Sequence, residues 1–197
     1  MMRTSAQRVA LILLMLLGGC ISVEQPNYFA LNATAAPISS DYHGSIGLRP
    51  VRIPEYLQRT RIVRTENNNT VDLSSDERWA EPLEDSIRRV MTLNLANLLP
   101  TDNIRSYPWS SKNSPDAVIA LHVLELTAKT GKVQIVVDVE LTGAVASNRL
   151  VRIDGELPPS ATGADIAAGY SELLAKLSET IAREIRLGAD LRDISGD

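Results

Sequence analysis

The sequence predicts a single α+β domain in which a largely antiparallel sheet carries two main helices on one face. Apolar and polar residues alternate over residues 132–142, which is typical of a strand with one buried face. Apolar residues recur at intervals of three and four over 79–99 and again over 166–185, which is typical of amphipathic helices. Because each helix has one apolar side, we expect both helices to cover the same face of the sheet.

The N-terminus has the features of a secretory signal peptide. Arg3 and Arg8 precede an apolar run, Val9 to Leu17, that is too short to span a bilayer as a helix. The run ends in Leu17-Gly18-Gly19-Cys20, with the only cysteine of the chain. This ending resembles the lipobox of bacterial lipoproteins, in which the cysteine thiol is lipidated and the chain is cut before it. The resemblance implies a cleaved signal peptide at 1–19; the alternative is an ordinary signal peptide with an incidental cysteine.

Lipidation of Cys20 determines where the protein is expected to reside. One acyl chain gives only marginal membrane binding, whereas the multiply acylated cysteine that a lipobox implies is a firm anchor. We therefore expect the protein to sit on a membrane without spanning it. Ile21 stands where the inner-membrane retention signal of such lipoproteins has an aspartate. The resemblance thus implies the outer membrane, with the protein facing the periplasm.

Size and charge limit the remaining possibilities. The 197 residues less the 19 of the signal peptide leave 178, enough for one domain with a real core. Loss of Arg3 and Arg8 moves the net charge from −4 to about −6, which disfavours nucleic acid as a partner. With Cys20 lipidated, no thiol remains for a disulfide or for thiolate chemistry.

Residues 20–44 are predicted to be a lipidated tether, because they contain Pro26 and Pro37 and show no sustained periodicity. The exception is Tyr28-Phe29-Ala30-Leu31. This segment either docks on the domain as a short strand or touches the lipid headgroups, and we favour docking.

The folded domain is predicted to span residues 45–190 and to begin with extended structure. Apolar residues are spaced as in a strand from Ile46 to Ile53. Residues 61–65 and 71–73 flank Asn67-Asn68-Asn69, a pattern typical of a β-hairpin.

The first helix is expected between Trp79 and Leu99, with Pro82 tolerated only in its first turn and Pro100 as its stop. Asn94 falls close to the apolar side of this helix. It is either a polar contact across an interface or a structural amide beneath a loop, and we favour the structural role.

The second half is predicted to be a three-stranded meander followed by a helix. The tight connection at 129–132 requires its two flanking strands to be antiparallel, and 146–148 leads to a third strand ending near Leu157. The helical stripe runs from Ile166 to Ile185 and is expected to end at Gly188, with a flexible tail at 191–197.

The residues give little sign of catalysis. His43 and His122 are isolated, which predicts no metal site. We interpret His122 as a core or interface histidine because it shares a strand face with Val118 and Ala120. Asp138 and Glu140 share a strand face, as paired acids in an active site do, but exposed carboxylates explain them as well. No nucleophile elbow, phosphate-binding loop or dinucleotide fingerprint occurs in the sequence. We expect neither an enzyme nor a cofactor.

One succession of motifs is more specific: Ile53-Pro54-Glu55-Tyr56-Leu57, Arg61-Ile62-Val63-Arg64, Arg78-Trp79-Ala80-Glu81-Pro82-Leu83 and Asn94-Leu95. Together with the lipobox and the last helix, it resembles the PqiC-like lipoproteins, the auxiliary lipoprotein components of ABC-type transport systems. The resemblance implies a docking component at the outer membrane that works with a periplasmic MCE-domain protein and its ABC transporter in lipid movement between the membranes. Docking on a symmetric tubular MCE assembly favours a homo-oligomeric ring.

Five residues are candidates for the partner interface: Tyr56, Leu57, Trp79, Pro82 and Asn94. The alternative is that Trp79 caps the core at the helix start and that Tyr56 packs beneath the hairpin. Two other functions stay open, a domain that carries lipid itself and a structural envelope lipoprotein without a transport role. A carrier needs an apolar cavity, and the sequence shows no surplus of large apolar residues for one.

Overall fold

The computed structural model of the protein describes residues 25–39, 42–65, 70–99, 101–143 and 145–195. The predicted signal peptide, Cys20 and the expected Asn67–Asn69 turn lie outside the described residues.

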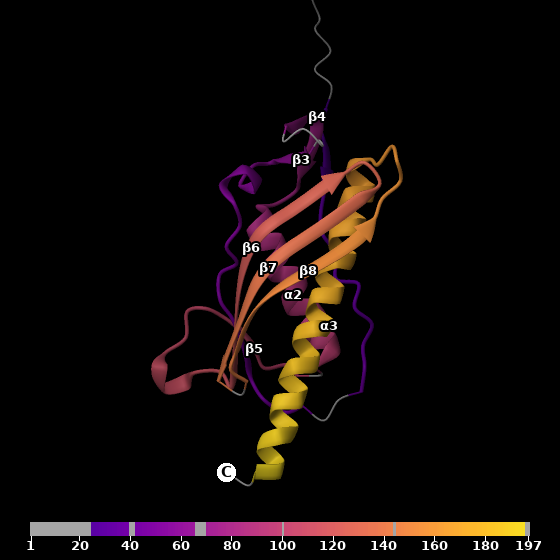
Figure 1. The fold of residues 1–197 in the computed structure, drawn as a ribbon. Coiled ribbons are helices and arrows are strands. Elements are labelled where there is room, and N and C mark those ends of the chain that lie inside the picture. Colours follow the sequence, from indigo (N-terminus) through magenta and orange to yellow (C-terminus); the bar gives the residue numbers. More distant parts are fainter. Residues whose placement is uncertain (1–24, 40–41, 66–69, 100, 144, 196–197) are drawn as a thin grey trace, which may run out of the picture.

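The described residues form one α+β domain with two mixed sheets and two long helices (Figure 1). The larger sheet has the strand order β5-β2-β6-β7-β8 and the smaller one the order β1-β4-β3. The strands of the two sheets are β1 (Asn27–Phe29), β2 (Ile46–Leu48), β3 (Arg61–Thr65), β4 (Val71–Trp79), β5 (Ile104–Ser106), β6 (Ala117–Lys129), β7 (Lys132–Gly143) and β8 (Ser147–Glu156). The helices are α2 (Leu83–Leu98) and α3 (Gly163–Ser195), with short 3-10 turns η1 (Glu55–Leu57) and η2 (Ser111–Asn113). Both long helices lie behind β6, β7 and β8 in Figure 1, so the predicted fold class is confirmed.

The predicted meander forms the centre of the larger sheet. β6 pairs antiparallel with β7, and β7 pairs antiparallel with β8. Gly131, with φ +78°, lies in the tight turn between β6 and β7 and adopts a left-handed backbone that glycine tolerates best. On the other side of β6, strand β2 runs parallel to both β6 and β5, so the complete sheet is mixed.

The interpretation of His122 as a core residue is wrong. The β6–β7 ladder shifts register between Val123 and Glu125, which is the mark of a β-bulge. Before the bulge the odd-numbered residues of β6 are buried, and after it Leu126 and Ala128 are buried. The bulge thus reverses which residues face the helices. His122 is exposed and lies on the outer face of the sheet.

The predicted hairpin is confirmed, but the helix after it starts later than expected. β3 and β4 pair antiparallel, and β4 continues to Trp79, the residue from which the helix was predicted. Pro82 has an extended backbone (ψ 133°) and precedes the first helical residue, Leu83. Trp79 therefore ends a strand and is separated from the helix by a short turn.

The N-terminal segment packs on the domain, as was favoured for Tyr28–Leu31. β1 pairs parallel with the end of β4, and Leu31 is completely buried. The carbonyl of Leu31 accepts a hydrogen bond from Arg89 at 2.9 Å, and the N–H of Asn32 donates to the Ser171 hydroxyl at 3.0 Å. The segment thus lies between α2 and α3 and is not a free tether in its described part.

Helix α3 continues past Gly188, where it was expected to end, and includes Ser195. A glycine inside a helix costs about 1 kcal/mol relative to alanine, and no proline follows to stop the helix. Residues 191–195, predicted as tail, therefore have helical backbone.

Candidate functional site

Three of the five residues predicted to contact a partner are buried. The exposed fraction is 5% for Trp79, 2% for Leu57 and 0% for Asn94. Tyr56 is half-buried and Pro82 is exposed. The three buried residues present no surface to another protein, and Trp79 packs in the core, as the alternative interpretation had it.

Asn94 organises the N-terminal segment from inside the domain. Its side-chain carbonyl accepts hydrogen bonds from the backbone N–H groups of Thr34 and Ala35, each at 3.1 Å. Asn97, one turn later, donates to the carbonyl of Ala35 at 3.0 Å. The amides of α2 therefore replace the sheet partners that this extended segment lacks.

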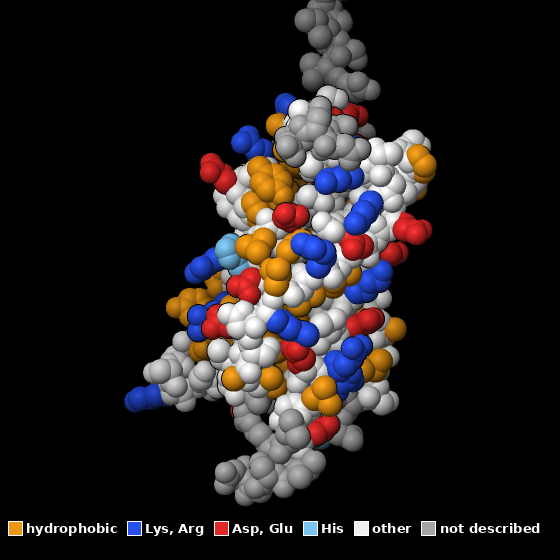
Figure 2. All heavy atoms as spheres, in the orientation of Figure 1, with side chains coloured by type: hydrophobic (Ala, Val, Ile, Leu, Met, Phe, Trp, Pro, Cys, Tyr) orange, Lys and Arg blue, Asp and Glu red, His pale blue; other side chains and the backbone are white. Residues whose placement is uncertain are grey.

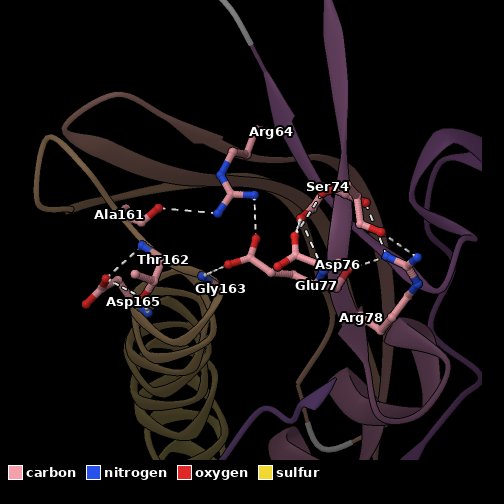
Figure 3. Close-up of polar contacts among 10 residues, drawn as sticks. Arg64, Ser74, Asp76, Glu77, Arg78, Ala161, Thr162, Gly163 and Asp165 are labelled. Atoms are coloured by element: carbon pink, nitrogen blue, oxygen red, sulfur yellow. Dashed lines mark hydrogen bonds and ion pairs between the residues drawn. The ribbon is translucent and has the colours of Figure 1, made fainter. Parts of the chain in front are cut away.

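A polar junction connects the β3–β4 hairpin to the start of α3 (Figure 3). The Arg64 guanidinium lies 2.7 Å from the Glu77 carboxylate, and Arg64 also donates to the carbonyl of Ala161 at 3.3 Å. Glu77 accepts a further hydrogen bond from the N–H of Gly163, the first residue of α3. Partial burial raises the pKa of Glu77, but the hydrogen bonds from Arg64, Gly163 and Ser74 outweigh it and lower the pKa below its ordinary value.

This junction occurs where β4 is irregular. The register between β3 and β4 shifts between Arg61 and Val63, which leaves residues 74–77 of β4 outside the regular ladder with β3. Arg78 donates to the carbonyls of Ser74 at 3.2 Å and Ser75 at 2.8 Å. The junction therefore has a structural role, and it fixes how the hairpin is placed on α3.

The outer face of the larger sheet carries a surface groove of about 480 Å³. Figure 2 shows acidic and basic side chains interspersed with apolar ones over the strands of this face. The groove is lined by Arg49, Pro50, Arg52, Tyr107, Ala120, Leu121, His122, Asp138 and Glu140.

The register of the strands places opposite charges on the two walls. Arg52 forms a parallel bridge with His122, and His122 pairs with Asp138 on β7. Because neighbouring strands are about 4.8 Å apart, the backbones of Arg52 and Asp138 are about 10 Å apart. Glu140 pairs with Ala120, whose small side chain leaves the space between the walls open.

The backbone holds the arginine wall in place. The N–H of Arg49 donates to the carbonyl of Ile119 at 2.9 Å, and the N–H of Arg52 donates to the carbonyl of Leu121 at 3.0 Å. Within the described ranges, no ion pair engages the side chains of Arg49, Arg52, Asp138 or Glu140. The groove therefore offers cationic and anionic groups that are both available to a ligand or partner.

The sequence identified Asp138 and Glu140 as a pair on one strand face and His122 by itself, but it did not identify Arg49 and Arg52. The two arginines reach the groove through the pairing of their segment with β6, which links residues about 70 positions apart. Pro50, between the arginines, is the only local signal, because it disfavours a regular strand there.

In the described part of the chain, no group of three or more His, Cys, Asp or Glu side chains is placed to hold a metal ion. Nor does any helix among these residues combine the length and the apolar character needed to cross a bilayer.

Comparison with known proteins places the domain in a family. The model of the ABC-type transport auxiliary lipoprotein component family matches residues 29–182. A crystal structure of an uncharacterized protein superposes with a TM-score of 0.64 at 21% identity, covering 82% of this chain and 99% of the other. A crystal structure of a Xanthomonas campestris protein of family DUF330 superposes with a TM-score of 0.69 at 11% identity, covering 85% and 99%. At these identities the two structures are evidence for the fold alone. None of the curated proteins matches the chain.

Proposed function

Because this chain belongs to the family of ABC-type transport auxiliary lipoprotein components, we propose that it is the outer-membrane-anchored dock of an intermembrane lipid transport system. Its partner in this proposal is a periplasmic MCE-domain protein with its ABC transporter. The observation that carries the proposal is the family match over residues 29–182, which runs from the last residue of β1 into α3. The family is one of transport auxiliary lipoproteins and not an enzyme family.

The sequence before the domain supports the anchor. Leu17-Gly18-Gly19-Cys20 supplies the lipid attachment site, and Ile21 lacks the aspartate of the inner-membrane retention signal. Acylation of Cys20 holds the domain on the periplasmic face of the outer membrane. A ring of several copies matches the symmetry of a tubular MCE partner.

We place the contact with the partner at the groove on the outer sheet face. Its arginine wall and its carboxylate wall each lack an ion-pair partner within the described residues. A partner segment that carries both an acidic and a basic side chain satisfies both walls at once. The charged lining is unlike the apolar pocket that a lipid carrier needs, so the groove favours docking over carriage.

The proposal is tested by gentle detergent extraction of the tagged protein, followed by mass spectrometry of the proteins and lipids that copurify. Recovery of an MCE-domain protein supports the dock. Phospholipid bound to the isolated domain favours a carrier, and an empty extraction repeated after crosslinking leaves a structural lipoprotein.

The role of the groove is tested separately by reversing one wall at a time. Arg52→Glu and Asp138→Lys each place like charges together and are expected to reduce the recovered partner several-fold. Arg183→Glu, an exposed arginine on α3, is the matched control and should leave recovery unchanged. If both groove variants recover the partner at the level of this control, the contact lies elsewhere.

A further inference from the structure

We propose that the end of the domain carrying the β3–β4 hairpin lies against the lipid surface, while the C-terminal part of α3 points away from it. This inference rests on the lipid anchor proposed above and adds the orientation of the domain on the membrane. It follows from how little chain separates the anchor from the first strand.

The chain between Cys20 and β1 is short. Seven residues lead from Cys20 to Asn27, and a fully extended chain of this length spans at most about 25 Å. Asn27 itself is fixed, because β1 pairs with β4 and the following Leu31 is buried between the helices. The lipid anchor is therefore confined to a short radius around the start of β1.

The direction of β1 shows which end of the domain this radius includes. β1 runs parallel to β4, with Asn27 beside Glu77, so the chain enters β1 from the side of Val71, the first residue of β4. Val71 pairs with Thr65, and Arg78 pairs with Arg61. The distance along the sheet from the level of Arg78 to the level of Val71 therefore equals the four-residue step from Arg61 to Thr65 on β3, or about 14 Å. Cys20 can pass the level of Val71 by only about 10 Å.

The lipid headgroup layer is itself several ångströms thick, since the headgroups add about 10–15 Å in total to a hydrocarbon core of about 30 Å. With the acyl chains in the bilayer, the hairpin end must therefore lie at or near the headgroups. Figure 1 shows the first described residues beside β3 and β4 at the top of the molecule, and α3 running from this end to the opposite one.

The side chains at this end suit a phospholipid surface. Val71 is an aliphatic residue that is 47% exposed. A hollow of about 110 Å³ next to the hairpin is lined by Arg64 and Lys129 among others. Lys129 has no ion-pair partner among the described residues and is free to meet a lipid phosphate.

The far end of α3 lies well away from this surface. Leu187 is 24 residues beyond Gly163, or about 36 Å along the helix. Gly163 is hydrogen-bonded to Glu77, so this distance starts from the level of β1. Leu187 is exposed and provides a reference position for the test.

The test uses the full acylated protein in vesicles of phosphatidylethanolamine and phosphatidylglycerol that carry a headgroup-attached nitroxide quencher. Val71→Cys and Leu187→Cys each introduce one free thiol, since acylation occupies Cys20, and each thiol receives the same fluorophore. The acylated mass is verified before labelling, so a failure of the anchor is detected separately from a failure of the orientation. Quenching is expected to be several-fold stronger at position 71 than at position 187.

A longer tether between Cys20 and the domain provides the decisive control. Ten Gly and Ser residues inserted between Cys20 and Gln25 extend the reach of the anchor well beyond the hairpin, so quenching at position 71 should fall toward the value at 187. Equal quenching at the two positions in the natural chain overturns the proposed orientation. Strong quenching at position 71 that the insertion leaves unchanged still supports the orientation, but it assigns the cause to the side chains at this end and not to the short tether.

Discussion

The indole ring of Trp79 stacks on the phenol ring of Tyr170, with 6.0 Å between the ring centroids and 25° between the ring planes. The contact joins the last residue of β4 to the second turn of α3, and both side chains are buried. Burial raises the pKa of the Tyr170 hydroxyl far above its ordinary value, so this ring stays neutral at physiological pH. The most prominent aromatic residue of the sequence motif is thus part of the core.

Trp79→Ala should destabilise the fold, because it removes a large buried ring and leaves a cavity beside Tyr170. The expected loss in the free energy of unfolding is about 3–5 kcal/mol, measured by urea denaturation. Leu150→Ala, at an exposed position on β8, is the control and should change stability little. A Trp79→Ala protein of normal stability that no longer recovers its partner would identify Trp79 as an interface residue.

Glu77→Gln should weaken the junction between the hairpin and α3 by about 1 kcal/mol at pH 7, because it removes the ion pair with Arg64. The pKa of Glu77 is lowered in the folded protein from its ordinary value of 4.5. The stabilisation is therefore complete above pH 4.5 and is lost as the pH falls through the lower, folded-state pKa.

Thermal unfolding of both proteins between pH 7 and pH 3 checks this dependence. The difference in melting temperature between the natural protein and Glu77→Gln should shrink only below pH 4.5. Glu179→Gln, at an exposed position on α3, should show no such dependence. A difference that stays constant down to pH 3 would exclude the Glu77 carboxylate as its source.

Asn94→Ala should loosen the N-terminal segment, because it removes the acceptor of the Thr34 and Ala35 N–H groups. Leaving these donors unpaired costs about 1–3 kcal/mol. The exchange of these two amide hydrogens should accelerate more than that of the β6–β7 ladder. Exchange that is unchanged relative to an Asn148→Ala control on the exposed face of β8 would contradict this structural role.

Gly143→Ala should destabilise the protein more than Gly131→Ala, although both glycines have positive φ. At Gly131 an added Cβ meets no atom within 4 Å, so only the left-handed backbone is penalised, by about 1–2 kcal/mol. At Gly143 the added Cβ would overlap the carbonyl oxygen of Asp116. Comparison of the two melting temperatures tests this order, and equal losses would show that backbone conformation alone matters.

Cys20→Ser should release the protein from membranes as a soluble precursor, because serine cannot take the thioether-linked lipid. Fractionation of envelopes and immunoblotting give the distribution and the size of the product. Ser22→Ala, which leaves the lipobox intact, is the control. A variant that still fractionates with membranes at the mature size would refute the lipoprotein assignment.

Periodicity predicted the regular elements well. The meander of β6, β7 and β8 and the main length of both helices follow patterns that repeat over ten or more residues. Prediction failed where a local feature interrupted the pattern. One extra residue near Val123 put His122 and Leu126 on opposite faces, and Pro82 separated Trp79 from its expected helix.

The candidate site was less accessible to sequence analysis than the fold. Motif residues such as Trp79 and Leu57 stand out by type, but the structure buries them. Arg49 and Arg52 carry no motif, and they face Asp138 only because their segment pairs with β6. Pairing between distant segments depends on the packing of the whole domain, and no local pattern encodes it.

Local sequence patterns were sufficient to predict the α+β class, the order of most elements, the lipid attachment at Cys20 and the resemblance to the family. These properties depend on hydrophobic period and on short motifs, which are local. The contacts of the folded domain were needed to show that the segment after Asn27 packs between the helices, that the two charged walls share a groove, and that β1 begins beside Glu77 of β4. Each of these depends on contacts between residues far apart in the chain, whose stability comes from burying a common core.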